Sequence, residues 1–171
     1  NSLYTTHYLV RVFPFSYIKI ELQGKTFDDP NRLFNHMGKS FYCAVTQKCD
    51  VRELIPEFFF FPEMFYNYND LNLGMVKDPN TDALVKLGDV DMPLWCHNDG
   101  YAFITAYRRS LEHKHINADI HKWFDLIFGN KQRSEEKYNI FYEESYETFE
   151  DKFNKADKDV KGYSLRMLEF G

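Results

Sequence analysis

Four consecutive phenylalanines at positions 58–61 lie between Pro56 and Pro62, accompanied by Glu57 and Glu63. Consecutive side chains point in at least two directions, so a helix or strand with one solvent-facing side cannot bury all four rings. The prolines interrupt any long regular element and favour extended geometry in the residues before them. The segment is therefore predicted to be irregular, deeply buried and covered on more than one side.

The composition is that of a folded, acidic chain. Of 171 residues, 18% are aromatic, which argues against disorder, and the length suits one domain. The formal net charge of −5 argues against nucleic acid as a partner and against a polybasic membrane-binding surface. No phosphate-binding loop, activated nucleophile or metal-ligand motif is present, so no cofactor and no metal are expected.

Periodicity predicts the elements of the first half of the chain. Apolar and polar side chains alternate toward the end of the stretch 8–22, which predicts a half-buried extended strand. Asp29 and Pro30 suit the N-cap and the first position of an amphipathic helix over residues 30–45. Residues 66–91 are rich in Asn, Asp and Gly, which predicts a surface loop excursion.

Helices dominate the second half of the prediction. A helix over residues 100–113 is expected to be capped by Asn98 or Asp99, and another over 118–128 by Asn117.

The last part of the chain is expected to begin with a helix at Ser134. A charge-dense solvated segment over 148–162 and a short final helix over 163–170 follow it.

Seven short motifs follow one another along the chain. They include Leu9-Val10-Arg11 with Pro14-Phe15, Leu22-Gln23-Gly24 with Phe27-Asp28, the phenylalanine segment, Pro93-Leu94-Trp95, and Trp123-Phe124-Asp125-Leu126-Ile127-Phe128-Gly129. Their order resembles that of the BEACH domain of the neurobeachin and lysosomal trafficking regulator type. The residues that carry the resemblance are Arg11, Pro14, Phe15, Gln23, Phe27, Asp28, Arg32, Phe34, Glu53, Pro56, Glu57, Phe58, Phe59, Pro62, Glu63, Trp95, Asn98, Trp123, Asp125, Phe128, Gly129, Gln132 and Arg133.

The resemblance implies a single BEACH domain over residues 1–171 that lacks its N-terminal portion. The implied fold is mainly α (α+β at most), with helices packed around extended, irregular buried segments. The implied function is that of a non-catalytic scaffold in a large cytoplasmic protein, peripheral to membranes, that regulates vesicle or lysosomal trafficking and autophagy. A preceding PH-like domain and following WD40 repeats are expected in such a protein, together with protein partners.

Charged side chains inside apolar motifs are the candidate chemical groups. Glu57, Glu63 and Asp125 would be costly to bury unless they pair with Arg11, Arg32 or Arg133. We expect structural ion pairs, so that Glu57→Ala would destabilise the fold. The alternative is an enzyme in which Glu57 and Glu63 form a general acid and base pair.

Lys131, Gln132 and Arg133 are the candidate partner-binding residues, because two cations directly follow a predicted helix. They could bind an acidic protein segment or a phospholipid head group, or only cap the helix before them. Direct phosphoinositide recognition is therefore the alternative to protein docking.

Three other groups of residues are expected to be structural. Cys43, Cys49 and Cys96 suggest reduced, buried thiols. The alternative is a zinc site of Cys49, Cys96 and His97, which no ligand spacing supports. Trp123 is expected in the core.

His113 and His115 are expected at the C-terminal end of a helix, where they would interact favourably with the helix dipole.

Overall fold

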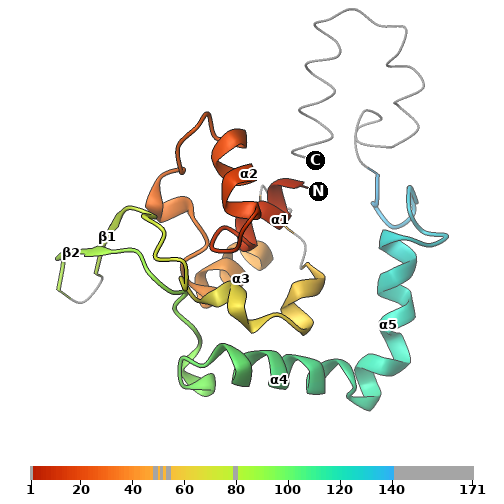
Figure 1. Ribbon diagram of the computed structural model, residues 1–171. Helices are drawn as coiled ribbons and strands as arrows, with labels where there is room; N and C mark the ends of the chain where they lie inside the picture. The colour runs from red at the N-terminus through yellow and green to blue at the C-terminus, as the bar shows by residue number, and fades with distance from the viewer. Residues whose placement is uncertain (1, 48–49, 51, 53–54, 79–80, 141–171) are drawn as a thin grey trace, which may run out of the picture. The chain divides into compact units, whose positions relative to one another are not determined.

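The computed structural model describes residues 2–47, 50, 52, 55–78 and 81–140. This part of the chain is mainly helical, as predicted (Figure 1). The elements in chain order are α1 (Ser2–Tyr8), α2 (Phe15–Leu22), η1 (Pro30–Arg32), α3 (Met37–Thr46), η2 (Pro56–Phe59), η3 (Pro62–Phe65), β1 (Met75–Lys77), β2 (Leu84–Lys86), η4 (Leu94–Cys96), α4 (Gly100–Leu111) and α5 (Lys114–Ile127), where η denotes a 3₁₀ helix. One compact unit comprises Leu3–Arg108, and the described residues from Arg109 onward belong to a second.

The predicted strand over 8–22 is wrong, because its second half forms α2. The buried residues of α2 are Ser16 and Lys19, which lie one helical turn apart, whereas Ile18 is 39% exposed. The Ser16 hydroxyl donates to the carbonyl of Val10 at 2.8 Å. The alternation of apolar residues therefore did not predict the buried face, because polar residues occupy the buried face of this helix.

The predicted helix over 30–45 is divided into two. Asp29 caps only the short helix η1, where its carboxylate accepts from the backbone N–H of Asn31 at 2.8 Å. Leu33 and Phe34 then leave the helical path and enter the core, at 3% and 1% exposure. α3 begins after His36, whose ring nitrogen Nδ1 accepts from the backbone N–H of Lys39 at 3.2 Å.

The phenylalanine segment is irregular, as predicted, but it does not bury all four rings. It forms η2 and η3, each of which has a proline at its first position. Phe58 is fully buried and packs edge-on against Tyr8 with ring centroids 4.9 Å apart. Phe60 is 61% exposed. A continuous, fully buried segment was expected. The chain instead forms two short helices, and the ring of Phe60 is exposed.

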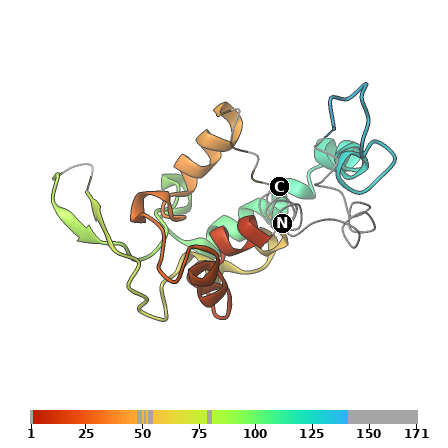
Figure 2. The same cartoon turned by 90° about the horizontal axis from the view of Figure 1, so that it is seen from above.

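Residues 66–91, predicted as a surface loop, contain an antiparallel hairpin in which Val76 of β1 pairs with Val85 of β2. The hairpin extends away from the other elements of its unit in both views (Figure 1 and Figure 2). Its base is not superficial, because Leu73 and Leu87 are buried with Val10 in a small apolar cluster.

The main core cluster is rich in aromatic and sulfur-containing side chains. It contains Tyr8, Leu9, Phe34, Met37, Ile55, Phe58, Met64, Phe65, Val90, Met92, Cys96, Phe103 and Ile104.

A buried guanidinium joins the irregular segments of the core. Arg11 is 1% exposed, and it donates from Nε to the carbonyl of Gly88 at 2.8 Å and from Nη1 to the carbonyl of Phe34 at 2.5 Å. Burial lowers the pKa of Arg11 to about 10, and the nearby carboxylate of Asp89 opposes that shift. Arg11 thus satisfies backbone groups that a non-helical interior would otherwise leave without donors.

Of the N-caps predicted for α4 and α5, one is confirmed and the other is wrong. Asp99 caps α4, as predicted, and its carboxylate accepts from the backbone N–H of Tyr101 at 2.8 Å. α5 begins at Lys114 with His113 as its N-cap, so the predicted cap at Asn117 is wrong.

The remaining predictions concern the end of the chain. The described residues from Ser134 to 138 form turns and not the predicted helix. The predicted segments over 148–162 and 163–170 lie outside the described residues.

The first prediction concerns Arg11. Arg11→Lys keeps the charge but loses the planar fork that reaches two carbonyls, so the free energy of unfolding should fall by about 2–4 kcal/mol. Urea denaturation measures this change. Glu57→Ala is the control. The structural ion pair expected for Glu57 is not found, because its side chain is only half-buried and has no hydrogen bond or ion pair among the described residues, so the expected destabilisation no longer follows. The effect of Glu57→Ala should stay within about 0.5 kcal/mol, and equal losses in both variants would contradict the role assigned to Arg11.

Candidate functional site

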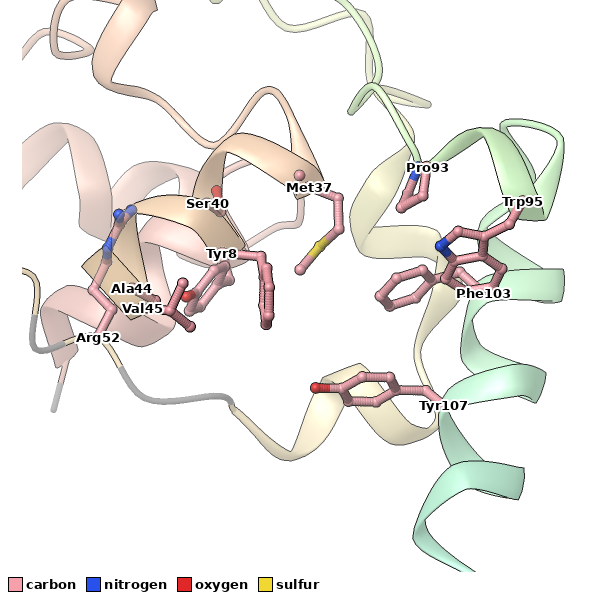
Figure 3. Close-up of a pocket in the computed structure, with 12 residues that line it drawn as sticks. Tyr8, Met37, Ser40, Ala44, Val45, Arg52, Pro93, Trp95, Phe103 and Tyr107 are labelled. Atoms are coloured by element: carbon pink, nitrogen blue, oxygen red, sulfur yellow. The ribbon is translucent and has the colours of Figure 1, made fainter. Parts of the chain in front are cut away.

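An apolar groove runs beside α3 in the unit Leu3–Arg108. Its volume is about 540 Å³. Figure 3 shows side chains of α3 on one side, and Trp95, Phe103 and Tyr107 of η4 and α4 on the other. The residues that line this groove are Tyr8, Met37, Gly38, Ser40, Phe41, Ala44, Val45, Arg52, Pro93, Trp95, Phe103 and Tyr107.

Stacked rings form the α4 side of the groove. Trp95 stacks on Phe103 with centroids 5.5 Å apart, and Phe103 stacks on Tyr107 at 5.4 Å. Trp95 is 57% exposed, although the adjacent Phe103 is buried. Burial also raises the pKa of Tyr107. The rings therefore offer a fixed apolar surface that is open to solvent on one side.

The α3 side of the groove is apolar and exposed to solvent. α3 buries Met37 at its start, whereas Phe41 and Val45 are 66% and 62% exposed. These two residues lie four positions apart and so share one face of the helix. An exposed apolar face of this kind, together with the exposed ring of Trp95, marks a surface suited to binding.

One cation lines the apolar groove, and two neighbours hold it in place. Arg52 donates from Nε to Asp50 at 2.7 Å and also pairs with Asp50 through Nη2. Its Nη1 lies 2.7 Å from Nε2 of His7. The hydrogen bonds from Arg52 lower the pKa of Asp50, and those with Asp50 raise the pKa of Arg52.

His7 is neutral in this arrangement. Burial, followed by the charges of Arg52 and Lys19, lowers the pKa of His7 from 6.5 to about 3. Nε2 is therefore an acceptor for Arg52, and the proton of the neutral ring lies on Nδ1.

A second, polar cavity of about 370 Å³ lies beside α3 and is called the cationic pocket below. It shares Ser40 and Arg52 with the apolar groove. Its lining residues are His7, Asn31, Arg32, Leu33, Asn35, Lys39, Ser40, Cys43, Gln47 and Arg52.

The predicted partner-binding residues lie in the second unit and line neither cavity. Lys131, Gln132 and Arg133 form a turn after α5. The backbone N–H of Lys131 donates to the carbonyl of Asp125 at 2.9 Å, which extends the hydrogen bonding of the helix end. Their backbone thus contributes to capping, and partner binding by their side chains stays a prediction.

The signature residues of the first unit are mainly structural. Asp28 and Arg32 pair at 2.5 Å, and the amide oxygen of Asn98 accepts from the backbone N–H of Met92 at 2.9 Å. Glu53 lies outside the described residues.

The signature residues of the second unit are more exposed than predicted. Trp123, expected in the core, is 38% exposed, and Phe128 is 78% exposed. Asp125 is half-buried. It makes no ion pair with another described residue, although pairing with an arginine was expected.

The two glutamates of the enzymatic alternative are half-buried and lie on separate short helices. Glu63 accepts from the hydroxyl of Tyr101 at 3.4 Å. Within the described ranges, no three His, Cys, Asp or Glu side chains are grouped as metal ligands.

Cys96 is buried and Cys43 is partly exposed, whereas Cys49 lies outside the described residues. His113 follows the C-terminal end of α4, as expected, and its backbone N–H donates to the carbonyl of Ser110 at 3.1 Å. It is also the N-cap of α5, and its ring centroid lies 5.2 Å from that of His115. His115 lies in the first turn of α5, so its expected position at a helix C-terminus is wrong. No helix in the described part of the chain has the length and apolar character needed to span a membrane.

Comparison with known proteins finds a family likeness over the whole chain. The family model described as Beige/BEACH domain matches residues 1–171. The chain is 39% identical over 169 residues to BEACH domain-containing protein B of Arabidopsis thaliana, an alignment that covers 96% of this chain and 6% of that protein. It is 41% identical over 145 residues to Protein SPIRRIG of the same organism, covering 82% of this chain and 4% of that protein. The chain therefore spans less than a tenth of the length of these relatives.

The second prediction concerns the pH dependence that His7 imposes. Its pKa is about 3 when folded and 6.5 ordinarily, so between these values the unfolded chain binds more protons than the folded one. The stabilisation is complete above 6.5 and is lost as the pH falls toward 3. His7→Gln keeps an acceptor for Arg52 but does not titrate, so stability should depend less steeply on pH in this window. Urea denaturation across the window measures both slopes, and equal slopes would contradict the assignment.

Proposed function

The chain belongs to the Beige/BEACH family, and from this membership we propose that it is a non-catalytic docking module of a large protein that regulates membrane trafficking. In this proposal the apolar groove beside α3 holds a segment of a partner protein. The parent protein is cytoplasmic and peripheral to vesicle or lysosomal membranes, and it acts in trafficking and autophagy. A PH-like domain precedes the module and WD40 repeats follow it, as the family resemblance implies.

The main support for the proposal is the amino-acid composition of the lining of the apolar groove. Among its described lining residues are five aromatic side chains, one methionine and one arginine, and none is Lys, Asp or Glu. Protein interfaces are enriched in aromatic residues, Met and Arg and depleted in Lys, Glu and Asp. Trp, Tyr and Arg also dominate the residues that contribute most to binding energy. The groove therefore has the chemistry of a protein-binding surface.

The geometry of the groove also accommodates a polypeptide occupant. Exposed Val45 and exposed Trp95 lie on opposite sides of a cavity of about 540 Å³ (Figure 3), and exposed Phe41 also lines it. Such a cavity is within the size range of binding sites for small ligands or for a few side chains. An inserted apolar side chain would be enclosed from both sides, and Arg52 would offer a charged donor at the same site.

The enzymatic alternative receives less support. Glu57 and Glu63 are half-buried, and neither lines the apolar groove or the cationic pocket. A general acid and base need a shared cavity in which both reach the same substrate.

Site-specific photocrosslinking in the parent protein tests the proposal. A photoreactive phenylalanine analogue replaces Phe41 in the apolar groove, or Tyr68, which is 68% exposed but does not line it. We expect crosslinks to a defined polypeptide from position 41 and not from position 68. Crosslinks from position 41 to lipid alone, or the same products from both positions, would refute protein docking in the groove.

The third prediction concerns Val45. Val45→Asp places a charge in the groove, and loss of one buried aliphatic side chain costs about 1.5–3 kcal/mol, so docking should weaken at least about tenfold. The free energy of unfolding should change by less than about 0.5 kcal/mol, because Val45 is largely exposed. Leu84→Asp is the matched control, since Leu84 is 65% exposed on the hairpin. Affinity for the crosslinked polypeptide is the measurement, and equal weakening in both variants would contradict the prediction.

A further inference from the structure

The cationic pocket concentrates positive charge in an acidic chain. The sequence has 26 acidic and 21 basic residues, yet the pocket is lined by Arg32, Lys39 and Arg52 and by no Asp or Glu. The three cations come from different segments, which are η1, α3 and the connection after α3. Converging cations that lie far apart in the sequence are not explained by a local charge run.

Each cation is held in place and still has hydrogen-bond donors available. Arg52 uses three of its five N–H groups on Asp50 and His7, which leaves two. Lys39 donates one N–H to the backbone carbonyl of Asn31 at 3.2 Å and retains two. Arg32 contacts Asp28 through Nη2 alone. The donors of Arg52 are therefore oriented before a ligand arrives, which reduces the entropic cost of binding.

The described lining of the pocket carries positive charge and no carboxylate. Asp28 and Asp50 pair with Arg32 and Arg52, but neither carboxylate lines the pocket. Lys39 donates to a neutral carbonyl, and Asp29, whose pKa is lowered by hydrogen bonds from Asn31 and also by the charges of Arg32 and Lys39, lies outside the lining. His7 is neutral and adds no charge. Neutral polar groups of Ser40 and Gln47 also line the pocket and can donate to an anion.

We propose that the cationic pocket binds a phosphate ester. A single carboxylate is satisfied by one guanidinium fork, whereas a phosphate group has three oxygens that accept from several directions. Arg32, Lys39 and Arg52 come from three segments, so they suit the three oxygens of a phosphate group better than a single carboxylate. The phosphate ester could belong to a soluble inositol phosphate or to a lipid head group, since both present the same chemistry to the pocket. This site does not depend on docking in the apolar groove.

Calorimetric titration of the 171-residue chain tests the proposal. The soluble probe is inositol trisphosphate, and inorganic phosphate is the minimal probe. Sedimentation with phosphatidylcholine vesicles, with and without a phosphoinositide, tests the lipid source. We expect saturable binding with one site, weakened by added salt. Binding of the soluble probe without vesicle binding assigns a soluble ligand, and recruitment only by phosphoinositide vesicles assigns a head group. The absence of binding to every phosphate probe would overturn the proposal.

Charge reversal at one lysine provides the matched comparison. Lys39→Glu removes the cation that donates to a neutral carbonyl, and loss of one charge-assisted hydrogen bond should weaken binding by about tenfold or more. Lys25→Glu makes the same charge change at an exposed position outside the pocket and should leave the affinity within about twofold. Thermal unfolding verifies that both variants fold. Equal losses of affinity in the two variants would show that the probe is attracted by the overall charge of the chain, and would overturn the site. Val45→Asp tests only the apolar groove.

Discussion

The fold of the larger unit depends on one buried guanidinium. Arg11 donates to the carbonyls of Phe34 and Gly88, which lie 23 and 77 residues away in the sequence, so it joins three segments that share no regular ladder. An interior built from 3₁₀ turns and extended connections leaves carbonyl groups without backbone donors, and those groups need side-chain donors. The same requirement explains the buried hydroxyl of Ser16, which donates to Val10. Apolar burial supplies the driving force in this core, and these polar contacts make its irregular path possible.

A second buried polar network connects the core to the surface that we propose is functional. His7 lies in α1 beside Tyr8 and Phe34, and its neutral ring accepts from Arg52. Arg52 in turn lines both the apolar groove and the cationic pocket. The orientation of a surface cation is thus determined by a histidine that the core keeps from being protonated. Precise placement of a binding group by packed neighbours is what a preorganised site requires.

Sequence reasoning identified those features that depend on local chemistry. The cap at Asp99, the interruption of regular structure by Pro56 and Pro62, and the mainly helical character follow from residue type and spacing. The α2 prediction failed because Ser16 and Lys19 occupy the buried face, so alternation of apolar residues pointed to the wrong structure. His7 and Arg52 were missed because they lie 45 residues apart, and no periodicity relates two such positions. Glu57, Glu63 and Asp125 were expected to be buried because their neighbours in the sequence are apolar. Neighbours in the sequence are not always neighbours in space, and all three side chains are only half-buried.

The two cavities beside α3 have a common wall, because Ser40 and Arg52 belong to both linings. A ligand that draws the remaining N–H groups of Arg52 toward one cavity removes them from the other. Occupancy of the two sites is then thermodynamically linked, and linkage is reciprocal: the factor by which an anion changes affinity for a polypeptide equals the factor by which the polypeptide changes affinity for the anion. The sign of this coupling depends on whether the two ligands share the guanidinium of Arg52 or compete for it.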